Sequence, residues 1–280
     1  MKSNEVRVAA VQLTSGADPE ANLERAVALV LQAIEQGATY VQLPEYVNYR
    51  GPTKYYVVVA ETIPGPTTSR LAEIAKEHLV TIHVGSVLER SDEPRKSYNT
   101  SVVLAPSGEI AATYRKGHLF DVNVPGEIEH LESKDIVAGD HLIVADLGGF
   151  TLGLSVCFDL RFPEMYRQLC LNGATVLAVP SSFAVATGRV HWEVLLRARA
   201  IENHAYVIAA AQAGTTAEGL SSFGHSMIVG PWGEVLAESD SDHEDVLVVT
   251  IDPDEVARRR AQISVLDLRR PELYRSLPEA

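Results

Sequence analysis

The chain has 280 residues, of which 46% are hydrophobic and 22% charged, so it can bury a sizeable core without disulfides or metal ions. Its 24 Lys and Arg residues and 37 Asp and Glu residues give a formal charge of −13, which argues against a nucleic-acid binder and a polybasic membrane anchor. No apolar run could span a bilayer and no signal-peptide core follows the N-terminus, so we expect a cytoplasmic protein without membrane contact.

The N-terminal part of the chain alternates between strand-like and helix-like segments. A nearly continuous β-type run predicts a buried strand over Val6–Leu13. Asp18-Pro19 then opens a predicted helix that reaches about Gln36 and ends at Gly37. Further along, the patterns predict a strand over Thr39–Leu43, a helix over Ser69–His78, a strand over Val80–Leu88 and a hairpin of Asn99–Leu104 with Glu109–Tyr114.

The segment Asp121–Asp140 shows no clear period and carries many charges, so we expect a functional loop without regular structure. An amphipathic helix over Val190–Asn203 is predicted from a shared apolar face, formed by Val190, Val194, Ala198 and Ile201. The other predicted elements are a hairpin of Leu142–Leu147 with Phe150–Val156, a helix over Pro163–Leu171, strands over Ala174–Val179 and Ala205–Ala211, a hairpin of Gly224–Val229 with Glu234–Ala237, a strand over Asp245–Ile251 and a helix from Pro253.

Strands that alternate with helices indicate parallel pairing, but three hairpins do not belong in a pure doubly wound sheet. We therefore predict an α/β protein in which mixed sheets are covered by helices. No Ser-, Gly- or Pro-rich linker interrupts the chain, so residues 1–280 are expected to form one domain.

Cys157 stands where a predicted strand ends, shortly before a predicted helix. Such a turn presents a nucleophile at the carboxyl end of the strand, and helix polarity there can lower a thiol pKa. The alternative is an inert buried cysteine, which is how we interpret Cys170, between two leucines of a predicted helix. Neither the two cysteines nor the nine scattered histidines show a disulfide framework or a metal-binding spacing.

Three more ionisable residues stand beside predicted strands or in the predicted loop. Glu45 follows a buried strand and Pro44, Lys116 lies just past the end of a strand, and Glu132 belongs to the charged loop. Taken one at a time, each is most simply a solvated surface residue. Only their combination with Cys157 points to chemistry.

Each of the three main candidates lies in a distinct motif: LPEY contains Glu45, YRKGHLFD contains Lys116, and SVCFDLRFPE contains Cys157. With these motifs, and with matching segments at 191–214, 221–238 and 263–274, the chain resembles the carbon–nitrogen hydrolase (nitrilase) superfamily over nearly its whole length. It is most similar to the Nit-type amidase branch, whose members hydrolyse ω-amides of 2-oxo acids, including deaminated glutathione.

The resemblance implies a four-layer α-β-β-α sandwich with two mixed sheets. It also implies that Cys157 attacks the amide carbon and forms a thioester, with Glu45 as the general base. Lys116 and the backbone amide of Phe158 would stabilise the oxyanion. Glu132 matches the second glutamate of the family, which orients the lysine and the substrate.

Residues near the implied nucleophile carry further expectations. The family pattern assigns the base to Glu45, so we expect His118 to be a loop residue beside the site. We expect the Arg161 guanidinium to pair with Glu164 or another buried acid. The residues expected to line the substrate pocket, by position, are Phe158, Ser182, Phe183 and Thr187.

The implied reaction releases ammonia from a small carboxylate-bearing ω-amide and needs neither a cofactor nor a metal. N-carbamoyl amidohydrolase or nitrilase activity stays open, because the same residues would perform the same attack. The non-enzymatic alternative is a binding or scaffold protein with a vestigial site. Family members associate through helices beside the sandwich, which implies at least a homodimer, with a small-molecule amide rather than nucleic acid or membrane as the other partner.

Overall fold

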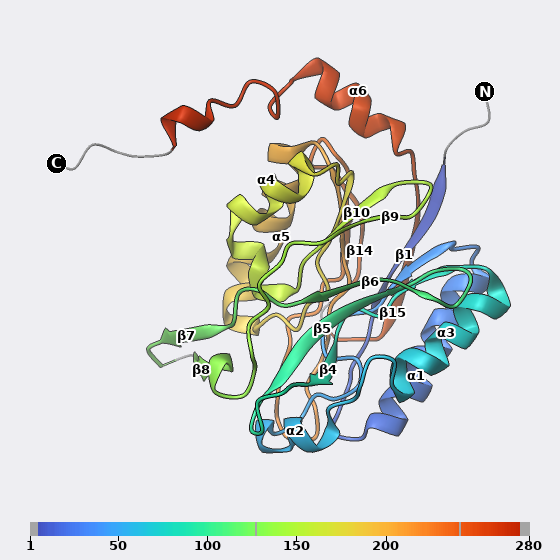
Figure 1. Cartoon of the computed structure of the whole chain (residues 1–280), viewed down its shortest axis with the longest axis vertical. Coiled ribbons are helices and arrows are strands. Elements are labelled where there is room, and N and C mark those ends of the chain that lie inside the picture. The colour runs from blue at the N-terminus through green and yellow to red at the C-terminus, as the bar shows by residue number, and fades with distance from the viewer. Residues whose placement is uncertain (1–4, 127, 241, 275–280) are drawn as a thin grey trace.

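Two mixed β-sheets stack face to face and carry helices on their outer faces (Figure 1). The computed structural model describes residues 5–126, 128–240 and 242–274. The α-helices are α1 (Pro19–Glu35), α2 (Tyr56–Val59), α3 (Pro66–His78), α4 (Pro163–Leu171), α5 (Val185–Asn203) and α6 (Asp254–Gln262). Short 3-10 helices cover Thr53–Tyr55, Glu132–Lys134, Cys157–Arg161 and Pro271–Leu273. None of the helices in these ranges combines the length and the apolar character needed to cross a membrane.

The first sheet consists of β1 (Val6–Gln12), β2 (Tyr40–Gln42), β3 (Thr81–His83), β4 (Val87–Arg90), β5 (Ser97–Leu104), β6 (Ile110–Arg115) and β15 (Asp245–Ile251). Its strand order is β15-β1-β2-β3-β5-β4, and β6 also pairs with β5. The central strands β1, β2 and β3 run parallel, whereas β15 and β5 flank them antiparallel.

The second sheet consists of β9 (Val144–Asp146), β10 (Thr151–Leu154), β11 (Val176–Ala178), β12 (Tyr206–Ala209), β13 (Met227–Val229) and β14 (Val235–Glu238). It repeats the plan of the first, since β10, β11 and β12 run parallel between antiparallel flanking strands. A separate hairpin of β7 (Asp121–Val124) and β8 (Ile128–Leu131) projects from the body (Figure 1).

The apolar run of β1 is continuous because both faces of this strand are buried. Successive side chains of a strand point to opposite faces. Val8 and Ala10 therefore join the core shared with the second sheet, while Ala9 and Val11 join the core that contains residues of α1 and α3. The predicted α/β sandwich with two mixed sheets is confirmed.

On the other outer face, α4 and α5 cover the second sheet. The buried side of α5 presents Trp192 and Leu196 to the core. The predicted apolar face of this helix lies outside instead, because the side chains of Val190 and Val194 are 64% and 66% exposed. A second apolar stripe thus remains on the surface of α5.

Several predicted boundaries were wrong. Val80–Leu88 is two strands, because the chain bends at Gly85, which has a φ of +76° and lies so close to Pro44 that an added Cβ would be 2.0 Å from its carbonyl oxygen. The charged segment predicted as an irregular loop contains β7 and β8. Helices α3 and α5 begin earlier than predicted, at Pro66 and Val185.

Candidate active site

A pocket of about 360 Å³ opens where strands of both sheets end. All eight residues predicted for the site line it. Glu45 follows β2 and Lys116 follows β6, both in the first sheet, whereas Cys157 and Ser182 follow β10 and β11 of the second. The site therefore lies at the junction of the two sheets, and its chemistry depends on how they pack.

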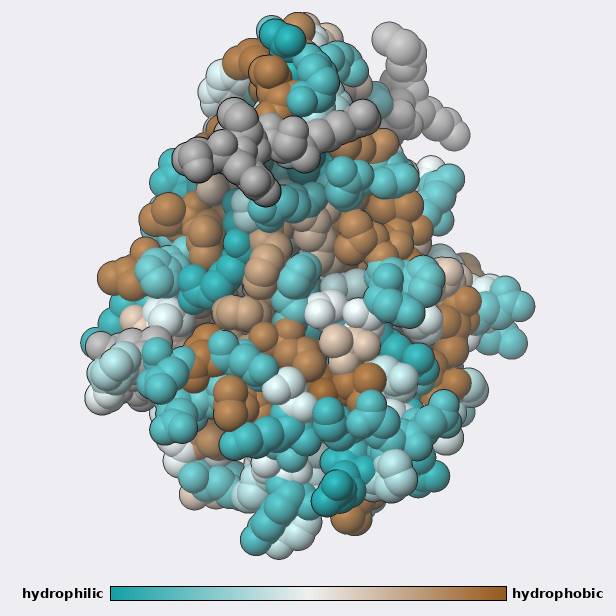
Figure 2. All heavy atoms as spheres, turned by 60° about the vertical axis from the view of Figure 1, so that its left-hand side comes forward, coloured by the Kyte–Doolittle hydropathy of each residue, from teal (hydrophilic) through white to brown (hydrophobic). Residues whose placement is uncertain are grey.

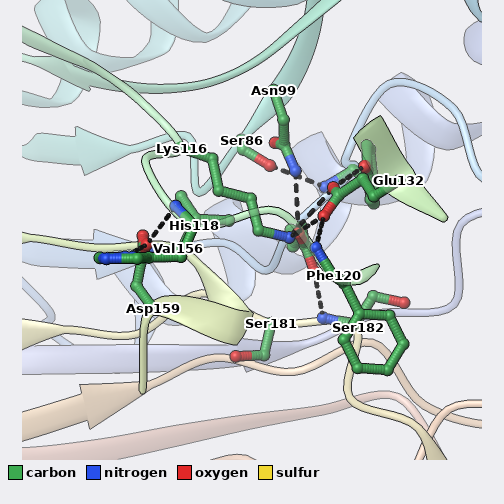
Figure 3. Close-up of polar contacts among 12 residues, drawn as sticks. Ser86, Asn99, Lys116, His118, Phe120, Glu132, Val156, Asp159, Ser181 and Ser182 are labelled. Carbon is green, nitrogen blue, oxygen red and sulfur yellow. Dashed lines mark hydrogen bonds and ion pairs between the residues drawn. The ribbon is translucent and has the colours of Figure 1, made fainter. Parts of the chain in front are cut away.

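The Glu45 carboxylate is 1% exposed and has partners on both oxygens. Its Oε1 accepts hydrogen bonds from Lys116 Nζ at 2.9 Å and from Asn99 Nδ2 at 2.8 Å. Its Oε2 accepts one from the backbone amide of Ser182 at 2.7 Å. Figure 3 labels the three donors, Asn99, Lys116 and Ser182, which come from different elements and point toward one another. These contacts hold it in one orientation.

The backbone around Glu45 is held by the bend that separates β3 from β4. Ser86 donates its amide hydrogen to the Pro44 carbonyl at 3.2 Å and accepts the Val47 amide at 2.9 Å. Its hydroxyl oxygen accepts the Tyr46 amide at 3.0 Å. Tyr46 has a φ of +59°, in the left-handed region that non-glycine residues rarely occupy. The bend thus supports a strained turn that aims Glu45 into the pocket.

Lys116 lies between two carboxylates. Its Nζ donates to Glu45 and, at 2.9 and 3.0 Å, to the two oxygens of Glu132. Burial alone would lower the pKa of Lys116, but the charges of Glu132 and Glu45 outweigh it and raise the pKa well above the usual value. The ammonium therefore stays charged at any physiological pH.

Glu132 is buried and ionised. Burial raises its pKa, but the Lys116 charge and the hydrogen bond from the Phe120 amide, at 2.6 Å, lower it below the usual value overall. The Tyr46 hydroxyl donates to the same carboxylate at 2.7 Å. Glu132 thus connects the lysine to two further residues of the pocket wall.

Cys157 occupies the predicted sharp turn between strand and helix. Its φ of +49° is again left-handed, and its amide donates to the Pro180 carbonyl at 2.9 Å, which fixes the turn to the end of β11. The expected lowering of the thiol pKa was wrong for this resting state. Burial, the charge of Glu45 and a hydrogen bond with it raise the pKa of Cys157, and Lys116 offsets this only in part. The resting thiol is therefore protonated, and Glu45 is the carboxylate whose charge acts on it most strongly.

Buried Asp159 connects the turn of Cys157 with the segment of Lys116. Its Oδ2 accepts the Val156 amide and the Tyr114 hydroxyl, each at 2.8 Å. Its Oδ1 accepts the His118 amide at 3.0 Å and lies 2.7 Å from Nδ1 of the same histidine (Figure 3). His118 is thus held beside the site by Asp159, as predicted, and does not line the pocket.

The Arg161 prediction was wrong. No carboxylate of the described residues lies within ion-pair distance of its guanidinium, which instead lies over the rings of Phe158 and Phe183. Its Nη1 is 3.3 Å from His191 Nδ1. Arg161 therefore stacks behind two aromatic residues of the pocket wall. The other cysteine, Cys170, is buried on α4 away from the pocket, as predicted.

Several residues of the site were missed from the sequence. Asn99 contacts Glu45, Tyr46 contacts Glu132, and Arg50 and Ser222 line the wall. Only Tyr46 and Arg50 had a local signal, since both follow Glu45 closely. No cluster of three or more His, Cys, Asp or Glu side chains within the described ranges is arranged to hold a metal.

The arrangement can perform acyl transfer. A protonated thiol shares the pocket with a buried carboxylate that can take its proton, and a permanently charged ammonium lies beside the same carboxylate. An acyl carbon placed at the sulfur would develop its negative charge close to this cation.

Comparison with known proteins agrees with this chemistry. The family model described as carbon–nitrogen hydrolase matches residues 7–261. The chain is 39% identical over 268 residues to the omega-amidase NIT2 of Mus musculus, covering 96% of each chain. It is 41% identical over 265 residues to a deaminated glutathione amidase of Synechocystis, covering 93% of this chain and 97% of that one.

Solved structures share the fold. The Caenorhabditis elegans NitFhit protein matches with a TM-score of 0.91 at 35% identity, over 98% of this chain and 67% of that chain. A mutant amidase from Nesterenkonia, with the acetamide moiety of fluoroacetamide covalently added at its active-site cysteine, matches with a TM-score of 0.81 at 29% identity, over 98% of this chain and 96% of that chain.

Proposed function

This chain belongs to the carbon–nitrogen hydrolase family, and on that basis we propose that it is an amidase that hydrolyses small ω-amides bearing a carboxylate. The observation that carries the proposal is that Cys157 lines the same pocket as buried Glu45 and Lys116, whose Nζ donates to the Glu45 carboxylate at 2.9 Å. The relatives named omega-amidase and deaminated glutathione amidase support this substrate class.

We propose that acylation starts with proton transfer from the Cys157 thiol to Glu45. The sulfur then attacks the amide carbon, and the carbonyl oxygen takes up the negative charge. Lys116 and the backbone amide of Phe158 stabilise that oxyanion. Collapse of the intermediate breaks the C–N bond, and Glu45 returns its proton to the leaving nitrogen, so ammonia departs and a thioester remains.

Deacylation reuses the same groups. Glu45, again ionised, takes a proton from a water molecule that attacks the thioester carbon. Lys116 stabilises the second oxyanion, and the Cys157 thiolate leaves and recovers the proton from Glu45. One water is consumed for each amide, and the products are a carboxylic acid and ammonia.

We assign Glu132 a positioning role. Its carboxylate holds Lys116 in place and keeps it charged, and its contacts with Tyr46 and the Phe120 amide fix its own orientation. Phe158, Ser182, Phe183 and Thr187 remain proposed substrate-binding residues, supported by their place on the pocket wall.

The test is an ammonia-release screen over ω-amides of dicarboxylic acids, N-carbamoyl amino acids and nitriles of matched size. We expect the highest kcat/KM on the ω-amides. A higher kcat/KM on N-carbamoyl compounds or nitriles would replace the proposed substrate class with one of these two. Release of no ammonia from any of them by the folded protein would contradict the amidase assignment.

We also propose that two copies of the chain associate through α5. The exposed apolar stripe of this helix, with Val190, Val194 and Ile201, supports an isologous helix interface. Figure 2 brings this side of the molecule forward and shows hydrophobic patches that interrupt its hydrophilic cover. A cytoplasmic location and a single domain over residues 1–280 stay predictions.

A further inference from the structure

Arg50 places a second cation on the wall of the pocket. The residue is 5% exposed, and its backbone amide donates to the Gly16 carbonyl at 2.9 Å. Its Nη2 donates to the Leu220 carbonyl at 3.0 Å and to the Ser222 hydroxyl at 2.8 Å. Protein groups thus hold its backbone and one side of its guanidinium in place.

The other side of the Arg50 guanidinium is unsatisfied. Its Nη1 is buried without a hydrogen-bond partner among the described residues, and no carboxylate of these residues lies within ion-pair distance. Burial lowers the pKa of Arg50 to about 10, so the group is still charged at neutral pH. A buried charge and an unpaired donor are both costly. Because Arg50 lines the same pocket as Cys157, its unpaired charge is suited to an anion bound there.

A line of short hydrogen bonds connects Arg50 to the reaction centre. Ser222 accepts from Arg50, and its Oγ is 3.0 Å from the Ser182 hydroxyl. The Ser182 amide in turn donates to Glu45 at 2.7 Å. Arg50 and Glu45 therefore lie on one continuous wall of the same pocket, separated by two serines.

We infer that Arg50 binds the distal carboxylate of the substrate, while the amide end of the substrate lies at Cys157. Resting on the proposed function, this inference specifies the substrate class as ω-monoamides of dicarboxylic acids. Lys116 is unsuited to the task because Glu45 and Glu132 already occupy its ammonium. A guanidinium forms strong charge-assisted hydrogen bonds with a carboxylate.

The experiment compares a dicarboxylic acid monoamide with its methyl ester, which has the same chain but lacks the charge. We expect the wild-type enzyme to prefer the acid in kcat/KM, and Arg50→Met to lower the kcat/KM of the acid ~30- to 1000-fold more than that of the ester, mainly through KM. Arg50→Lys keeps the charge but cannot retain both wall contacts, so it should recover part of the preference. If Arg50→Met does not fold, the ratio of kcat/KM on the acid to kcat/KM on the ester is compared between Arg50→Lys and the wild type. An unchanged ratio in Arg50→Lys contradicts the inference.

Arg70→Met is the matched control, because Arg70 is an exposed arginine on α3 that pairs with Glu73. This variant should keep the wild-type preference for the acid. The inference is overturned if the wild-type enzyme does not distinguish acid from ester. It is also overturned if folded Arg50→Met keeps the preference for the acid, and Arg161→Met then tests the other arginine near the pocket wall.

Calorimetric binding of the monoamide to Cys157→Ala, with and without Arg50→Met, separates this inference from the proposed function. Arg50-dependent binding without ammonia release by the wild type would contradict the amidase and keep Arg50 as the anion site. Ammonia release with binding that is independent of Arg50 would keep the amidase and contradict the Arg50 assignment.

Discussion

Glu45 shows how a single carboxylate can be prepared for proton transfer before a substrate arrives. Its oxygens accept hydrogen bonds from an ammonium, an amide side chain and a backbone amide, while the thiol it must deprotonate lines the same pocket. Because the pKa of Cys157 is raised, sulfur nucleophilicity depends on that neighbour and not on a free thiolate. Base and nucleophile act as one unit.

The two cysteines provide a matched pair of variants. Cys157→Ala should lower kcat/KM by at least ~10³-fold, because covalent catalysis is lost with the sulfur. Cys170→Ala should stay within a few-fold of wild type, since Cys170 is a buried side chain of α4 outside the pocket. Ammonia release by purified variants measures both, and equal losses in the two would contradict the assignment.

Variants at position 116 test whether catalysis depends on the charge or on the shape of the side chain beside Glu45. Lys116→Met keeps much of the stem but removes the ammonium, so it should cost a few kcal/mol of transition-state stabilisation. Lys116→Arg keeps a charge with a bulkier fork and should recover little. Steady-state kcat/KM on the best ω-amide, with folding checked by thermal melt, gives the answer. Wild-type rates in folded Lys116→Met would remove the lysine from the mechanism.

At the scale of elements, the bend between β3 and β4 is tied to the catalytic base. An alanine Cβ at Gly85 would lie 2.0 Å from the Pro44 carbonyl oxygen, so the turn that carries Glu45 has to move. We expect Gly85→Ala to lower kcat/KM at least ~10-fold, because small displacements of a catalytic group cost this much or more. Activity and denaturant melts are the measurements.

Gly173→Ala is the control for backbone strain alone. Gly173 also has a left-handed φ, +99°, but an added Cβ there would meet no atom within 4 Å. Its variant should lose about 1 kcal/mol of stability and keep full activity. Equal activity of the Gly85 and Gly173 variants would show that the bend does not position Glu45.

The sequence was informative where one local signal decides the structure. Buried β-runs and the turn after them located Glu45 and Cys157 at strand ends, as the structure has them. The β7–β8 hairpin was missed because its strands are charged and short. Arg50 was missed because its significance is a missing partner, which only three-dimensional packing reveals.

Amphipathic patterning also has a limit that α5 illustrates. The helix has two apolar stripes, and periodicity cannot tell which of them faces the core. In the structure, the stripe that contains Trp192 and Leu196 is the buried one. The split of Val80–Leu88 is similar, since only the approach of Gly85 to Pro44 requires it.

At the scale of the molecule, a buried polar network lies between the sheets. His83 is fully buried, with Nδ1 at 3.1 Å from the Tyr40 hydroxyl and Nε2 at 2.6 Å from the Ser101 hydroxyl. Burial lowers the pKa of His83 from 6.5 to about 3. Below pH 6.5 the unfolded chain therefore binds a proton that the folded chain does not, and stability falls as the pH falls.

His83→Gln tests this pH dependence. Between pH 6 and pH 4, the unfolding free energy of wild type minus that of the variant should fall by about 1.4 kcal/mol per pH unit. Urea melts at each pH measure it. His78→Gln, which alters an exposed residue at the end of α3, should leave the wild-type slope unchanged. A slope that His83→Gln does not alter would assign the acid sensitivity to other groups.

The exposed apolar stripe of α5 makes the proposed dimer testable by one substitution. Val194→Glu puts a charge into the exposed stripe of α5, so we expect it to convert a dimer into monomers without loss of fold. Sedimentation velocity measures the oligomeric state, and circular dichroism measures whether the variant is folded. A Val194→Glu protein that sediments as wild type would place the interface elsewhere.

The division of the site between the two sheets has a consequence for biosynthesis. Glu45 and Lys116 follow strands of the first sheet, and Cys157 follows a strand of the second. A nascent chain with only one sheet formed holds a thiol without its base, or a base without its thiol. Its cysteine then lacks the base that deprotonates it. The sulfur becomes nucleophilic only after the two sheets have docked. The return of ammonia-releasing activity during refolding would mark the completion of that step.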